Sequence, residues 1–270
     1  MRSSSFLERL HAAARANGSW LCIGLDPEPA SDVIGFLCGI IDATSDLVCC
    51  YKPNLAFFEA LGLPGQEALR AVLRAMPAAV PVLIDAKRGD TPNTMQAYAR
   101  AIFDELDADA VTVSPYLGGD SLAPFFAYPD RGVFVLCKTS NPGAGEIQDM
   151  TVADGEPLFL SVARRAQTWD RHGTLGLVVG ATYPRDVARV RAIAARPPIL
   201  LPGVGAQAGD LAASVRAGVD ALGERAVVNA SRTILYASKG ADWQSAARRE
   251  ALRLRDEIEA ARREAVPAVR

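Results

Sequence analysis

Short apolar runs alternate with longer amphipathic segments along the whole chain. Eight of these runs have the length of strands, and they are nearly continuous in apolar and β-branched residues, as strands buried on both faces should be. They cover residues 20–25, 47–52, 81–86, 110–114, 132–137, 175–180, 198–203 and 225–230. The pattern predicts eight strands of a parallel sheet.

The segments between these runs have helical periodicity or carry helix caps. They predict helices over residues 32–44, 66–76, 94–106, 156–172, 184–195, 209–217 and 241–264. Eight strand–helix repeats indicate an α/β fold, and specifically a (β/α)8 TIM barrel. We expect a single domain over residues 1–270, with a C-terminal helical extension from about residue 241.

An open, doubly wound sheet is the alternative fold. Such a sheet favours a GxGxxG turn after its first strand when it binds a dinucleotide. Here the first strand ends in GLDPEP, which lacks that turn. The barrel therefore remains the preferred prediction.

Composition narrows the class of protein further. The 270 residues are half hydrophobic and carry a formal net charge of -2, so charge gives no reason to expect a nucleic acid polymer or a membrane as partner. The first residues lack the apolar core of a signal peptide, and no run approaches the ~20 apolar residues of a membrane span. We expect a cytoplasmic protein.

Cysteine and histidine do not form a recognisable metal motif. The five cysteines include no CxxC pair, and the two histidines, His11 and His172, are far apart in the sequence. Reduced, buried thiols and no metal site are therefore expected.

The densest group of charges follows the third predicted strand, in the run DAKRGD. Alternation along a strand puts Asp85 and Lys87 on the same side, and Asp90 follows after a glycine turn. Lys52 ends the neighbouring strand. The carboxyl ends of barrel strands meet at one mouth, and opposite charges a few ångströms apart keep one another ionised. The sequence predicts a charged array at the mouth; an ion-pair network that only closes the barrel is the structural alternative.

A second cluster is suited to phosphate. Barrels often bind phosphate at the loops after strands seven and eight. Strand seven leads into the glycine-rich turn at 202–207, and strand eight leads into Asn229-Ala230-Ser231-Arg232. Arg232 can form a bidentate contact with phosphate oxygens. The glycine- and proline-rich stretch 141–156 follows strand five and is typical of a lid over a site.

Together these motifs resemble the orotidine 5'-phosphate decarboxylases, most closely a bacterial subgroup with a long fifth loop. The family signature Asp-x-Lys-x-x-Asp matches Asp85, Lys87 and Asp90, and the similarity runs through most of the barrel. The resemblance implies catalytic roles for Lys52, Asp85, Lys87 and Asp90, and substrate-binding roles for Asp26, Thr94, Ser140, Gly203, Gln207, Ser231 and Arg232.

The resemblance also implies how the substrate is held. Asp26 in GLDP would contact the ribose, and Ser140 in KTSNPG would read the pyrimidine ring. Gln207 and Arg232 would hold the phosphate. Ser231 stands where the family usually has glycine, but its backbone N–H can still donate a hydrogen bond.

The expected reaction is the conversion of orotidine 5'-phosphate to UMP and CO2 in de novo pyrimidine biosynthesis, without a cofactor. Lys87 would stabilise a carbanion-like state at C6 and then protonate that carbon. The family pattern further implies a homodimer with shared active sites, in which Asp90 and Thr94 reach into the partner subunit's site.

Two other functions stay open on the sequence alone. A related barrel uses the same Asp-x-Lys-x-x-Asp run with a metal ion on a phosphosugar, as a decarboxylase or aldolase, and would need a further acidic ligand near strand two. Glu59 is the acidic residue that lies closest after Lys52. A non-catalytic barrel that binds a phosphorylated metabolite is the other alternative, although four retained charges argue against it. Lys138 falls outside the predicted catalytic set.

Overall fold

Eight parallel strands form the centre of the molecule. In the computed structural model, which describes residues 4–29, 32–203 and 208–266, they are β1 (Leu21–Leu25), β2 (Cys50–Pro53), β3 (Leu83–Arg88), β4 (Ala110–Val113), β5 (Gly132–Lys138), β6 (Leu175–Val179), β7 (Ile199–Leu201) and β8 (Ala226–Ala230). Hydrogen bonds join them in the order β2-β1-β8-β7-β6-β5-β4-β3. Bridges from Tyr51 to Val82 and from Asn54 to Asp85 connect the two end strands. The sheet closes into a barrel, which confirms the predicted fold.

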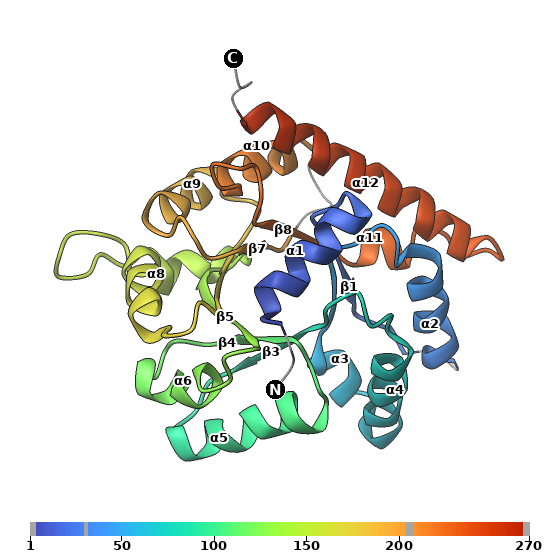
Figure 1. Ribbon diagram of the computed structural model, residues 1–270, viewed down its shortest axis with the longest axis horizontal. Helices are drawn as coiled ribbons and strands as arrows, with labels where there is room; N and C mark the ends of the chain where they lie inside the picture. The colour runs from blue at the N-terminus through green and yellow to red at the C-terminus, as the bar shows by residue number, and fades with distance from the viewer. Residues whose placement is uncertain (1–3, 30–31, 204–207, 267–270) are drawn as a thin grey trace.

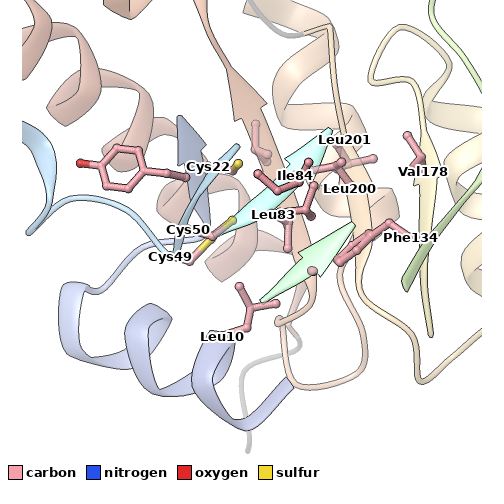
Figure 2. Close-up of a cluster of buried hydrophobic side chains, with 14 of the residues drawn as sticks. Leu10, Cys22, Cys49, Cys50, Leu83, Ile84, Phe134, Val178, Leu200 and Leu201 are labelled. Atoms are coloured by element: carbon pink, nitrogen blue, oxygen red, sulfur yellow. The ribbon is translucent and has the colours of Figure 1, made fainter. Parts of the chain in front are cut away.

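Consecutive residues of a strand are buried together, because side chains fill the barrel on one face and helices cover the other. Leu83 and Ile84 of β3 are fully buried, and so are Leu200 and Leu201 of β7. Figure 2 shows these four side chains in one apolar cluster with Phe134 of β5. Each predicted apolar run overlaps one observed strand. All five cysteines are free thiols, and Cys38 alone among them is only half-buried.

The helices form a ring around the barrel (Figure 1). They are α2 (Val33–Thr44), α3 (Leu55–Glu59), α4 (Gly62–Ala75), α5 (Pro92–Arg100), α6 (Gly119–Phe126), α8 (Leu158–Trp169), α9 (Pro184–Ile193), α10 (Ala208–Gly218) and the short α11 (Arg232–Leu235). The sequence pattern missed α6, which begins at a glycine and contains Pro124, both poor helix formers.

Two predicted helices differ from the structure at their C-terminal ends. The segment predicted as one helix over 94–106 is α5 followed by a π-helical turn, η1 (Ala101–Glu105). The helix predicted to reach residue 172 ends at Trp169. There the Asp170 carboxylate accepts hydrogen bonds from the backbone N–H groups of His172, Thr174 and Leu175, which turn the chain into β6.

Helix α1 (Phe6–Asn17) closes one end of the barrel, and Figure 1 shows it crossing the face of the strands. It begins with a capping box between Ser5 and Glu8. The Phe6 ring packs edge-on against Phe134, with centroids 5.7 Å apart. A Cβ on Gly132, the first residue of β5, would stand 2.5 Å from the Phe6 ring, so only glycine fits there. Since α1 covers the N-terminal strand ends, the open mouth is at the carboxyl ends.

The chain ends in the long helix α12 (Trp243–Ala265), which lies along α10 and α2 on the outside of the ring (Figure 1). Its buried positions recur at helical spacing, as expected for a helix with one face against the barrel: Ala246, Ala247, Ala251, Leu254, Ile258 and Ala261. Among the residues described, no helix combines the length and the apolar character that a membrane crossing requires.

Candidate active site

Three charged side chains meet at the carboxyl ends of β2 and β3. The Lys52 ammonium lies 2.9 Å from Asp85 Oδ2, and the Lys87 ammonium lies 2.6 Å from Asp85 Oδ1. Lys52 and Asp85 are buried, whereas the Lys87 side chain is 48% exposed toward the mouth. The carboxylate is therefore shared between one enclosed and one accessible ammonium group.

The pKa values of the buried pair follow from this geometry. Burial alone would raise the pKa of Asp85, but the charges of Lys52 and Lys87 outweigh it and hold that pKa well below its usual range. Burial alone would lower the pKa of Lys52, yet the neighbouring carboxylates of Asp85 and Asp26 raise it. Both groups are ionised near neutral pH, so the mouth holds a fixed pattern of charge.

Lys87 does not continue β3 as a regular strand residue. The register against β4 shifts between Ile84 and Arg88, so residues 85–87 together face the single residue Thr112. Lys87 has a φ of 46°, in the left-handed region. Its side chain meets Asp85 through this bulge, whereas the sequence argument relied on simple strand alternation.

In the described part of the chain, Asp90 and Thr94 form no hydrogen bond or ion pair with Lys52, Asp85 or Lys87. Asp90 Oδ1 accepts a hydrogen bond of 2.6 Å from the Thr91 backbone N–H, and no ion pair among the described residues includes Asp90. Thr94 is half-buried on α5. Among the described residues, the ion pairs of this cluster join Lys52, Asp85 and Lys87 and do not include Asp90.

Asp26 follows β1 and faces the same mouth. A Cβ on Gly24 would stand 3.2 Å from Asp26 Oδ2 and 1.9 Å from Ser231 Oγ, so the two side chains lie against the same glycine. Asp26 Oδ1 is buried and has no hydrogen-bond partner among the residues that the structure describes. A buried carboxylate oxygen without a donor is costly, and a hydroxyl group of a ligand would satisfy it.

On the opposite side of the mouth, the ends of β5, β6 and β7 come together around Ser140. A Cβ on Gly180 would lie 3.0 Å from Ser140 Cβ, and one on Gly203 would lie 3.1 Å from Ser140 Oγ. Gly203 has a φ of 93°, which L-residues rarely adopt. Gln207 lies outside the described residues.

Ser231 and Arg232 follow β8. Asn229 Nδ2 donates to Ser231 Oγ over 3.4 Å, and this holds the hydroxyl beside β1. Arg232 starts α11 and is exposed. Its guanidinium makes no hydrogen bond or ion pair with any other described residue, so its donors are available to a ligand.

The fifth loop is tied to the barrel through Lys138, which is only 2% exposed. Its ammonium pairs with Asp149 and lies 5.1 Å from the centroid of the Tyr183 ring. The Gln148 side chain accepts from the Thr139 backbone N–H at 2.8 Å. The loop contains the helical turns η2 (Pro142–Ala144) and α7 (Gly145–Gln148). These contacts fix both ends of the segment that begins with Ser140.

Two residues that the sequence analysis did not single out contact the buried charged side chains at the mouth. Thr112 donates to Asp85 Oδ1 over 2.8 Å, and Asp149 pairs with Lys138. The sequence could have indicated Thr112, because it is the polar residue within the apolar run of a strand buried on both faces. Nothing in the sequence indicated Asp149, since only the folded loop brings it to Lys138.

Glu59, the candidate metal ligand of the alternative function, pairs with Arg88 at 2.6 Å. Arg88 in turn lies 4.8 Å above the Tyr98 ring. Within the described ranges, no group of three or more histidine, cysteine or acidic side chains is arranged to hold a metal ion. Glu59 thus forms a surface ion pair with the last residue of β3.

A closed parallel barrel with lysines and carboxylates at its carboxyl strand ends belongs to the class of barrel enzymes. Comparison with known proteins specifies the family. The model of the orotidine 5'-phosphate decarboxylase / HUMPS family matches residues 19–249. An orotidine 5'-phosphate decarboxylase of Roseiflexus sp. (strain RS-1) is 53% identical over 268 residues, covering 95% of this chain and 98% of the relative. This chain belongs to the orotidine 5'-phosphate decarboxylase / HUMPS family.

Solved structures agree with this assignment. The OMP decarboxylase of Leishmania donovani superposes with a TM-score of 0.86 at 44% identity, covering 96% of this chain and 98% of that one. A Toxoplasma gondii protein described as a putative orotidine-monophosphate-decarboxylase gives a TM-score of 0.88 at 38% identity, with 97% and 99% covered. The metal-dependent phosphosugar enzyme and the non-catalytic barrel find no support among these relatives.

Proposed function

We propose that this chain is a carboxy-lyase that converts orotidine 5'-phosphate to UMP and CO2 in de novo pyrimidine biosynthesis. The observation that carries the proposal is the Asp85 carboxylate held between the Lys52 and Lys87 ammonium groups at the mouth of the barrel. This array gives a fixed electrostatic environment for a reaction that develops negative charge on carbon.

In the proposed reaction the bond between C6 and the carboxyl carbon breaks, and the electron pair stays on C6. Lys87 faces this carbon, stabilises the developing charge, and gives its Nζ proton to C6 as CO2 leaves. Water then restores the proton on Lys87. We propose that these protein groups suffice and that no cofactor takes part.

The other members of the array position the reacting groups. Asp85 would lie beside the departing carboxylate and keep Lys87 charged. Lys52 would orient Asp85 and a ribose hydroxyl. The buried Asp26 Oδ1, which has no donor among the described residues, would accept from the ribose. Burial of Lys52 and Asp85 makes this arrangement rigid before substrate arrives.

The phosphate would bind on the other side of the mouth. Arg232 offers an exposed guanidinium, and Gly203, Gln207 and Ser231 are proposed to complete the contact. Ser140 would read the pyrimidine ring from the base of the fifth loop. Binding energy from this remote group can order the loop over the reacting carbon.

We also propose a homodimer with shared active sites. Phe57 follows β2, and Tyr116 and Leu117 follow β4; all three are exposed large apolar side chains. They flank the strand end that carries Asp90, whose carboxylate accepts from the Thr91 backbone N–H and forms no ion pair with another described residue. An interface on this side would bring Asp90 and Thr94 to the partner's Lys87. The site is complete only in the dimer under this proposal.

Two further proposals concern the chain as a whole. We propose that residues 1–270 fold as one cytoplasmic domain in which α12 is an extension of the barrel. The apolar face of α12 against the ring supports this. A single cooperative unfolding transition, seen alike by far-UV circular dichroism and tryptophan fluorescence, is the expected result.

The function is tested by following the ultraviolet absorbance of orotidine 5'-phosphate with purified protein, with and without a chelator. We expect conversion to UMP at the same rate in both samples. Loss of turnover in the chelator would point instead to the metal-dependent alternative. Binding of the nucleotide without turnover would point to a non-catalytic barrel.

The shared site is tested by mixing two inactive variants, Lys87→Ala and Asp90→Ala. In a mixed dimer one site receives both changes and the other receives neither, so random exchange should restore about a quarter of the wild-type activity. Each variant alone is the control. No recovery after verified subunit exchange would place Asp90 in its own chain's site.

A further inference from the structure

Thr112 occupies a position between the two catalytic side chains of β3. It lies on β4, is 1% exposed, and faces the bulge formed by residues 85–87. Its hydroxyl donates to Asp85 Oδ1 over 2.8 Å and accepts from the Lys87 backbone N–H over 3.0 Å. One buried hydroxyl therefore contacts both the carboxylate and the backbone of the proposed proton donor.

The direction of both hydrogen bonds is fixed by chemistry. An ionised carboxylate only accepts, and a backbone N–H only donates. The group between Asp85 and Lys87 must therefore donate one hydrogen bond and accept another, and a hydroxyl does both. Valine has the same shape and can do neither, whereas serine retains both functions.

The contact also acts on a strained piece of backbone. Lys87 is a non-glycine residue with a φ of 46°, a conformation that costs energy unless surrounding contacts hold it. Its N–H bond to Thr112 is one such contact, and the hydrogen bond from the Ser114 N–H to the Arg88 carbonyl at 2.8 Å is another. The orientation of the half-exposed Lys87 side chain depends on this turn.

We propose that Thr112 is a positioning residue for decarboxylation, whose hydroxyl sets the Lys87 turn and the orientation of Asp85. The inference rests on the proposed function, because it assigns Thr112 to the same reaction. The hydrogen bonds of the Thr112 hydroxyl go to Asp85 and to the Lys87 backbone, and not to the residues proposed to hold the phosphate. Loss of the Thr112 hydroxyl should therefore lower turnover more than it weakens substrate binding.

The test compares three Thr112 variants (valine, serine and alanine) with the wild type by steady-state kinetics and by UMP affinity. Thr112→Val keeps the shape and loses the hydroxyl; Thr112→Ser keeps the hydroxyl and loses the methyl. We expect Thr112→Val to lower kcat by about tenfold to a hundredfold, equivalent to ~1.4–2.7 kcal/mol of barrier. KM and the Kd for UMP should stay within about threefold, since uniform binding is not affected. Thr112→Ser should stay within about threefold of wild type in kcat, because it keeps both hydrogen bonds.

A second comparison separates the loss of the hydroxyl from any effect of the lost methyl group on folding. Thr112→Ala and Thr112→Ser both lack the methyl group and differ only in the hydroxyl, so their kcat ratio isolates the two hydrogen bonds. A crystal structure of the alanine variant should show the Lys87 φ or side chain displaced. Equal kcat values for serine and alanine, or an unchanged kcat in folded Thr112→Val, would overturn the proposal. An inactive wild type would instead overturn the proposed function, which keeps the two failures distinct.

Discussion

The two sides of the barrel mouth differ in how their polar groups are held. At the ends of β2, β3 and β4, the side chains of Lys52, Asp85 and Thr112 are buried and linked by hydrogen bonds to one another and to Lys87. At the end of β8, Arg232 is exposed and has no polar partner in the part of the chain that the structure describes.

The difference matches what each side is proposed to do. Electrostatic catalysis requires charges that are oriented before the reaction, because reorienting them would add to the barrier. A phosphate grip requires donors that are free to meet the ligand and to transmit its binding energy to a loop. Under the proposed function, the protein preorganises one half of the site, and the substrate completes the other half.

The largest effect is expected at the preorganised side. Asp85→Ala should lower kcat/KM by about 10⁴ or more, since it removes the group that orients both lysines. It should also reduce the free energy of unfolding by about 3–5 kcal/mol, because Lys52 is left buried without its partner. Kinetics and urea unfolding measure the two effects.

Asp149→Ala is the matched control for this prediction. It also removes a carboxylate from a buried lysine, Lys138, but away from the proposed reacting carbon. We expect a far smaller loss of kcat than in Asp85→Ala. An equal loss of kcat in the two variants would contradict the division of the mouth into a reacting side and a binding side.

A smaller effect is expected at the phosphate side. Arg232→Ala should lower kcat/KM by about 10–100-fold, the value of a charge-assisted contact, and should weaken UMP without weakening uridine. Arg196→Ala, an exposed arginine near the opposite end of the barrel, is the control. If uridine binding weakened as much as UMP binding, Arg232 would not be a phosphate contact.

The fifth loop lies between these extremes in its structure, because its base is fixed while much of it is exposed. Lys138→Met keeps the buried alkyl volume and breaks the pair with Asp149, so we expect KM to rise by about three- to tenfold, within the range for one such interaction. Stopped-flow binding of UMP is the additional readout. An unchanged KM would show that the Lys138–Asp149 pair does not order the loop for substrate.

The smallest expected effect is the pH dependence of stability, because it is absent near neutral pH. The pKa of Asp85 is lower in the folded protein than its ordinary value of 3.8. Its contribution to stability is therefore fully present above that value and is lost as the pH falls through the lower, folded pKa. The difference in unfolding free energy between wild type and Asp85→Asn should stay constant from pH 8 to about pH 5 and shrink below about pH 4. A difference that already shrinks between pH 7 and 5 would contradict the ion-pair geometry.

Much of the fold could be predicted from the sequence because a parallel barrel buries its strands on both faces. That burial leaves continuous apolar runs such as those at β5 and β8, whose limits the pattern predicted closely. Helix α6 escaped prediction because its glycine start and internal proline hide a helix that tertiary packing stabilises.

The candidate site was predictable only in part. Lys52, Asp85 and Lys87 lie at strand ends, and barrel topology alone brings such ends together. The bulge at Lys87 and its contact with Thr112 depend on the register between β3 and β4, which no local pattern specifies. Asp90 was grouped with Lys87 by its place in the run, yet the hydrogen bond that the structure gives its side chain comes from the neighbouring Thr91 backbone N–H.

The most direct test of the account is turnover of saturating orotidine 5'-phosphate by Lys87→Ala, measured together with its UMP affinity. We predict a kcat reduced by about 10⁴ or more, because both the stabilising charge and the proton source are lost. The Kd for UMP should change by less than about fivefold, since the phosphate side is intact. A folded variant that retains kcat within about tenfold of wild type would contradict the assignment of Lys87 as the proton donor.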